Sequence, residues 1–211
     1  MLNLFVKAAD GLSEPSALFE DDTHKTPTDW SPDGRAVLYV MRGDDLMGVD
    51  VETKRTFPVA NTPANEGWGE FSPDGRFIAY QSENGGRVEI YVRTFPGDEG
   101  KWLVSAAGGT QPRWRRDGKE LYYIAPDDRL MAVPITPDKS GRTLDIGAAI
   151  PPFRTNLVTT GASGVITIAA GPKQQYDVAP DGRFLMVVPA AESTAPAPIS
   201  IVINWPTTLE R

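Results

Sequence analysis

The sequence predicts an all-β protein built from antiparallel hairpins, and three observations lead to this prediction. A tight-turn motif that ends in Asp-Gly recurs four times, each time between an apolar residue and a run rich in β-forming residues. The 20 glycines and 19 prolines among the 211 residues are spread along the chain, which is typical of many short turns. No segment shows the apolar spacing of an amphipathic helix.

The four copies of the turn motif are spaced like the blades of a β-propeller. Their aspartates are Asp33, Asp74, Asp117 and Asp181, at spacings of 41, 43 and 64 residues. The first two spacings match the roughly 40–45 residues of one four-stranded blade, and the third leaves about twenty additional residues near 155–171. The sequence therefore predicts one all-β domain over 1–211. This domain is an antiparallel β-propeller of about four to five four-stranded blades, either partial or closed by oligomerisation.

The predicted blades repeat one order of strands. Residues 1–25 form a half blade with strands at 2–7 and 17–19. Full blades follow at 26–60, 61–108 and 109–155, and a last blade with an insertion at 156–211. Inner strands end at a large apolar residue, which is Trp30, Phe71, Trp114 or Val178. Third strands are expected at 46–51, 88–93 and 130–135, outer strands at 55–59 and 101–105, and a final strand at 199–204.

The chemistry of the turns supports this order. In Ser-Pro-Asp-Gly, proline fixes φ at the first corner, aspartate suits the second, and glycine supplies the positive φ that follows. We therefore expect the four turn aspartates to cap their own turns rather than to bind a ligand.

The motifs also resemble those of a known family. The turns at 30–34 and 71–75, followed by Ile-Ala-Tyr at 78–80 and Ile-Tyr-Val-Arg at 90–93, resemble the WD40-like (PD40) repeats of TolB-like β-propellers. Residues 109–123 and 199–205 are similar to the carboxy-terminal part of propellers fused to bacterial serine/threonine kinases. The resemblance implies a propeller that binds peptides, partner proteins or small ligands on one face.

Propellers of this family commonly have six blades, so the open ends of the chain need an explanation. Three alternatives follow. The chain closes by itself as a small ring whose terminal strands share a blade, a homo-oligomer covers the open blade edges, or the chain is a piece of a longer protein.

The composition excludes several kinds of chemistry. The chain has no cysteine and one histidine, His24, which excludes disulfides, thiolate or multi-histidine metal sites and a cysteine nucleophile. The net charge of -7 argues against nucleic acid as a partner. No window is apolar enough to predict a membrane span, and the first residues do not resemble a secretory signal. We therefore expect a cytoplasmic protein, or an extracytoplasmic one if the chain belongs to a longer protein.

Acidic residues gather on one predicted face of the propeller and give the best functional indication. This acidic loop face is formed by the hairpins between second and third strands and by the links between blades. Carboxylates without histidine or thiol partners suit a hard cation such as Ca²⁺, although aspartate is also a common turn residue. The candidate metal ligands are Asp21, Asp22, Asp44, Asp45, Glu66, Asp127 and Asp128. His24 and Asp22 are candidate catalytic residues, because a carboxylate can orient a histidine that acts as a general base.

Two functions of different classes fit these observations. The first is a binding module that recognises a protein or small-molecule ligand on the acidic loop face. The second is a Ca²⁺-dependent hydrolase of lactones or esters, in which the metal polarises the carbonyl and a carboxylate moves the proton. Convergence of three or more of these acids on one point would favour the hydrolase.

Overall fold

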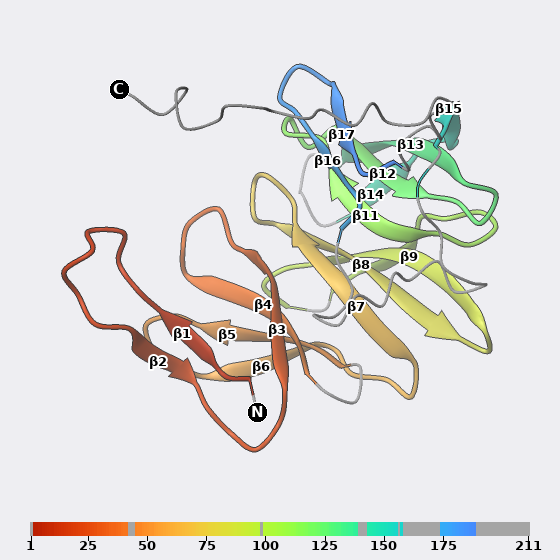
Figure 1. Ribbon diagram of the computed structural model, residues 1–211. Coiled ribbons are helices and arrows are strands. Elements are labelled where there is room, and N and C mark those ends of the chain that lie inside the picture. The colour runs from red at the N-terminus through yellow and green to blue at the C-terminus, as the bar shows by residue number, and fades with distance from the viewer. Residues whose placement is uncertain are drawn as a thin grey trace, which may run out of the picture.

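The protein is described by a computed structural model that covers residues 2–41, 45–97, 99–138, 143–155, 157 and 174–188. These residues form seventeen β-strands and no helix (Figure 1). The predicted all-β class is therefore confirmed. No helix in these ranges has the length and apolar character that crossing a membrane requires.

All strand pairs are antiparallel, and the strands fall into five sheets in chain order. The first sheet contains β1 (Leu4–Val6) and β2 (Ser16–Phe19). The second contains β3 (Lys25–Trp30), β4 (Ala36–Met41), β5 (Asp45–Asp50) and β6 (Thr56–Ala60). The third contains β7 (Asn65–Phe71), β8 (Phe77–Asn84), β9 (Arg87–Thr94) and β10 (Lys101–Leu103).

The remaining two sheets complete the described part. The fourth contains β11 (Thr110–Trp114), β12 (Glu120–Ile124), β13 (Arg129–Pro137), β14 (Leu144–Ile146) and β15 (Ile150–Arg154). The fifth contains β16 (Tyr176–Val178) and β17 (Phe184–Met186). The strand expected at 199–204 lies outside the described residues.

The sheets follow one another as the blades of a partial propeller. Figure 1 shows β1–β2 at one side of the molecule and β16–β17 at the opposite side. Within the described ranges these two terminal sheets do not pair with each other. The alternative in which the terminal strands share one blade involves the strand expected at 199–204, which lies outside the described residues, so this alternative stays a prediction.

The Asp-Gly turns form as predicted. Asp33 Oδ1 accepts hydrogen bonds from Ser31 Oγ at 2.6 Å and from the Arg35 N–H at 3.0 Å. Asp74 repeats this pattern, and Asp117 and Asp181 each accept the N–H two residues further on. The glycine that follows each aspartate has φ between 71° and 84°. The prediction that these aspartates cap their own turns is confirmed.

The core lies between neighbouring sheets. Leu38 and Leu46 of the second sheet pack with Ile78 of the third, and all three side chains are fully buried. Gly69 on β7 is part of this contact, since a Cβ there would lie 2.8 Å from the Leu46 methyl groups. The close approach of the two sheets therefore depends on the missing side chain.

Two details differ from the sequence prediction. Phe71 and Trp114 are buried as expected, whereas Trp30 is 46% exposed, because β3 is preceded only by the short two-stranded β1–β2 sheet. Strand β15 was not predicted, and it pairs with the first half of β13 while β14 pairs with the second half. Its sequence Ile-Pro-Pro-Phe-Arg suits an edge position, where missing N–H groups are tolerated.

Candidate functional site

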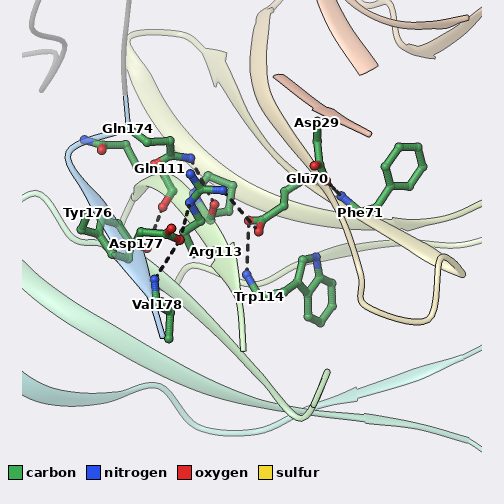
Figure 2. Close-up of polar contacts among 11 residues, drawn as sticks. Asp29, Glu70, Phe71, Gln111, Arg113, Trp114, Gln174, Tyr176, Asp177 and Val178 are labelled. Atoms are coloured by element: carbon green, nitrogen blue, oxygen red, sulfur yellow. Dashed lines mark hydrogen bonds and ion pairs between the residues drawn. The ribbon is translucent and has the colours of Figure 1, made fainter. Parts of the chain in front are cut away.

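A row of polar side chains connects the innermost strands of successive sheets. Asp29, Glu70, Arg113 and Asp177 occupy the same place in the repeat, directly before the apolar residue that precedes each turn. They lie on β3, β7, β11 and β16, and Figure 2 shows them close to one another. We call these four residues the inner-strand row.

The carboxylates of the inner-strand row in the second and third sheets each accept a hydrogen bond from the backbone of the next sheet. Asp29 Oδ2 lies 2.7 Å from the Phe71 nitrogen, and Glu70 Oε2 lies 3.2 Å from the Trp114 nitrogen (Figure 2). The same repeat position therefore joins each sheet to the one that follows it.

The third member of the inner-strand row carries the opposite charge. Arg113 Nη1 lies 3.5 Å from Glu70 Oε1, and its Nε lies 3.9 Å from Asp177 Oδ1. Arg113 thus contacts the carboxylate of the preceding sheet and that of the following sheet.

A second set of bonds joins the fourth and fifth sheets. Gln111 Nε2 donates to Gln175 Oε1 at 2.9 Å, and Gln111 Oε1 accepts the Gln175 N–H at 2.8 Å. The Tyr176 hydroxyl donates to the Gln111 carbonyl at 2.8 Å. Gln111 has φ of 57° at a register shift in β11, and Trp68 has φ of 55° at the equivalent shift in β7. These bulges change the direction of β7 and β11 at equivalent positions of their repeats.

Burial shifts the ionisation of two members of the inner-strand row, Asp29 and Glu70. Glu70 is 15% exposed, and burial raises its pKa to about 8; Arg113 opposes this shift and Asp29 adds to it. Burial also raises the pKa of Asp29. The Glu70 carboxyl is therefore largely protonated at neutral pH. Since the row bonds sheet to sheet, its chemical role here is to fix the relative positions of the blades.

The predicted site near the amino terminus is occupied by internal contacts. Asp21 Oδ1 accepts a short hydrogen bond from Lys25 Nζ and another from the Thr23 N–H at 2.7 Å. The bond from Lys25, together with those from the hydroxyl and the N–H of Thr23, lowers the pKa of Asp21 to about 2. The Lys25 side chain is fully buried. His24 and Asp22 are exposed, and in the described structure no hydrogen bond joins them.

Two further predicted ligands are also engaged by neighbours. Glu66 is buried, and its carboxylate accepts a short hydrogen bond from the Thr62 hydroxyl. Asp127 Oδ1 accepts the Arg129 N–H at 3.3 Å, and Asp127 Oδ2 lies 3.2 Å from Arg129 Nε. Both acids therefore stabilise the segment to which they belong.

The last three predicted ligands have different environments. Asp128 is a turn residue with φ of 63°, and its backbone carbonyl accepts both the N–H and the hydroxyl of Thr155 at 2.7 Å. Asp45 begins β5, and its carboxylate has no hydrogen-bond or ion-pair partner among the residues described. Asp44 lies outside the described residues.

The structure does not bring the predicted acids together in the part of the chain that it describes. No group of three or more histidine or acidic side chains there has an arrangement that could hold a metal ion. Because Asp44 is not described, the calcium site remains a prediction.

A groove that was not predicted lies on the other face. It encloses about 780 Å³ between the second and third sheets, at the end of the molecule that carries the Asp-Gly turns. Val59 and Ile78 are buried beneath it, and Phe57, Phe95 and Pro96 line it. The Phe57 ring, on β6, lies 5.8 Å from the Phe95 ring, which directly follows β9. We call this feature the turn-face groove.

Three arginines give the turn-face groove positive charge. Arg93 donates a short hydrogen bond to the Val59 carbonyl and another to the Gly97 carbonyl at 2.9 Å, so it bridges the two sheets. Arg35 and Arg55 are exposed, and within the described ranges their guanidinium groups have no hydrogen-bond or ion-pair partner. The groove thus combines an apolar wall with two guanidinium groups that make no direct hydrogen bond or ion pair among the described residues, although the charge of Arg35 acts on Asp33 and Asp50.

Comparison with known proteins identifies the fold. No family model and no curated protein matches the sequence. Among solved structures, TolB from Acinetobacter baumannii matches with a TM-score of 0.60 and 16% identity, over 90% of this chain and 44% of that one. An oligogalacturonate lyase in complex with manganese matches with a TM-score of 0.56 and 13% identity, over 83% of this chain and 48% of that one.

The third match is a candidate 6-phosphogluconolactonase from Bacteroides uniformis. It has a TM-score of 0.53 and 16% identity, and the match covers 88% of this chain and 57% of that one. The chain spans about half the length of these structures. The fold is therefore that of a β-propeller. More particularly, TolB is among its structural neighbours, as the repeat motifs led us to expect.

Proposed function

We propose that this protein is a non-catalytic binding module, and that the turn-face groove is its recognition surface. The observation that carries the proposal is the meeting of an apolar wall and unpaired guanidinium groups in one groove of about 780 Å³. Ligand sites in proteins are typically concave, mostly apolar and equipped with a few polar groups that fix orientation.

The location differs from the acidic loop face on which the sequence placed recognition. On that face Asp21, Glu66 and Asp127 accept hydrogen bonds from residues nearby in the chain. Carboxylates engaged in this way contribute less to an outside ligand. On the turn face, Arg35 and Arg55 have no such internal bonds among the described residues.

A blocking variant tests the proposal. Thr56 is exposed and lines the turn-face groove, so Thr56→Trp should fill it with little effect on the core. The protein is screened by methyl NMR against a panel of small carboxylates, phosphates, acidic sugars and short peptides. We expect binders to shift the Val59 and Ile78 methyl signals and to lose affinity for Thr56→Trp.

The matched control is Thr26→Trp, which places the same indole at an exposed position on β3 outside the groove. This variant should bind as the wild type does. Binders that are insensitive to Thr56→Trp, or the absence of any shift at Val59 and Ile78 across the panel, would contradict the proposal.

Calcium-dependent hydrolysis of lactones or esters is the second candidate. It is supported by the carboxylates of Asp22 and Asp45, which have no partner among the described residues on the acidic loop face. Calorimetric titration of chelator-treated protein with Ca²⁺ tests it. A calcium site would raise the melting temperature by mass action and would be lost in Asp45→Ala.

A further inference from the structure

Arg35 differs from the arginines that occupy its place in other repeats. Arg76 and Arg183 also follow the glycine of their turns, and each ion-pairs with the aspartate of its own turn through Nε at 2.7 Å. Arg35 makes no such contact with Asp33, although the surrounding sequence is Ser-Pro-Asp-Gly-Arg in both its own repeat and that of Arg76. Its guanidinium is thus left available at the groove.

The charges that line the turn-face groove are not balanced. Its lining contains three arginines, Arg35, Arg55 and Arg93, and two aspartates, Asp33 and Asp50. The groove therefore has one net positive charge, whereas the whole chain has a net charge of -7. Both aspartates accept hydrogen bonds within their own turns, and those bonds, with a smaller contribution from the charge of Arg35, lower their pKa. The groove is therefore a positive region on an acidic protein, which favours anionic groups over neutral ones.

The apolar wall restricts the class of anion. Phe57 and Phe95 are partly buried, and the rim also contains Pro96. A fully hydrated anion would gain nothing from this wall, whereas a ligand that carries both carboxylates and an apolar side chain would contact both parts.

We propose that the turn-face groove binds an extended acidic segment of a partner protein, with aromatic or aliphatic side chains against Phe57 and Phe95 and carboxylates at Arg35 and Arg55. This inference rests on the proposed function and names its partner. In an extended segment, successive side chains point to opposite sides, so acidic and apolar residues in alternation can reach the guanidinium groups and the wall together. The groove draws its lining from two sheets, which provides room for several residues.

The test uses the whole chain and a defined probe. A fluorescein-labelled peptide in which Glu alternates with Phe and Leu is titrated with protein at low salt and followed by anisotropy. Two control peptides replace every Glu by Gln, or every Phe and Leu by Ala. We expect the parent peptide to bind more tightly than either control, and its affinity to fall as salt is added.

Substitutions assign the binding to the groove. Because Arg35 and Arg55 are exposed and unpaired in the described structure, Arg35→Gln with Arg55→Gln should leave the fold intact. We expect this double variant to bind the parent peptide about tenfold more weakly or worse, since it loses two charge-assisted contacts. Arg183→Gln, at the equivalent repeat position, should bind as the wild type does.

The outcomes separate this inference from the proposed function. Equal binding to the wild type and the double variant, or no peptide binding, would overturn the inference. If a small carboxylate or an acidic sugar shifts the Ile78 methyl signal while the peptide does not bind, the groove is a site for another ligand. If nothing in the panel shifts that signal, the inference and the proposed function both fail.

Discussion

Glu70→Gln is expected to remove most of the pH dependence of stability between pH 5 and pH 8. In the folded protein the pKa of Glu70 is raised from 4.5 to about 8 by burial. Between these values the native state binds one proton that the unfolded state releases. The free energy of unfolding therefore falls as the pH rises. The stability that protonated Glu70 contributes is complete below pH 4.5 and is lost as the pH passes through about 8.

The size of the effect follows from the width of this window. One proton corresponds to about 1.4 kcal/mol per pH unit, so the whole window is worth at most about 4–5 kcal/mol. Glutamine cannot ionise, and its side-chain oxygen can still accept the Trp114 N–H. The variant should keep the slope that comes from Asp29, because burial raises the pKa of Asp29 in the same direction.

The assay is urea unfolding at a series of pH values from 5 to 9, followed by tryptophan fluorescence. Glu52→Gln is the control, since Glu52 is exposed and should leave the slope of the wild type unchanged. Equal slopes for the wild type and Glu70→Gln would refute the account of Glu70 as a buried, protonated carboxyl.

Three further predictions concern single contacts. Lys25→Ala removes the buried ammonium that donates to Asp21 and Asn3. Hydrogen exchange measured by mass spectrometry should therefore accelerate in β1 and β2. Equal acceleration in β8 would contradict this prediction. Trp114→Phe should cost no more than about 1 kcal/mol in urea unfolding, because the buried Nε1 has no hydrogen-bond partner to lose, whereas Trp114→Ala should cost about 3–5 kcal/mol. Gly109→Ala should destabilise the fold by about 1–3 kcal/mol and lower its melting temperature. The reason is that the added Cβ would lie 2.5 Å from the Tyr123 ring, so an unchanged melting temperature would show that the ring moves aside at no cost.

The sequence predicted correctly those parts of the fold that depend on contacts between residues close together in the chain. The Ser-Pro-Asp-Gly turns form from contacts within five residues, so the turn at Asp33 and the strands on either side of it were predictable. Strand β15 was missed because Pro151 and Pro152 give no strand signal, and because its pairing with β13 depends on the edge that β13 offers.

The inner-strand row and the turn-face groove were not predicted from the sequence, because both involve residues of two different repeats. The alignment of repeats already placed Asp29 and Glu70 at one position, but their partners lie 42 and 44 residues further along the chain. Arg35 and Arg76 follow the same four residues and still differ in their contacts. The turn motif therefore does not determine the contacts of this arginine, and the turn-face groove takes its lining from two sheets that a single repeat does not contain.

The inner-strand row also bears on how such a chain can change its number of blades. Between the second and third sheets, and between the third and fourth, the hydrogen-bond acceptor is a side chain of one blade and the donor is a main-chain N–H of the next. Nearly every residue type supplies that N–H, so a copied blade can be accepted without a matching substitution in its own sequence. Duplication or loss of a repeat then leaves this hydrogen bond between blades in place wherever the preceding blade retains its carboxylate, which favours variation in blade number.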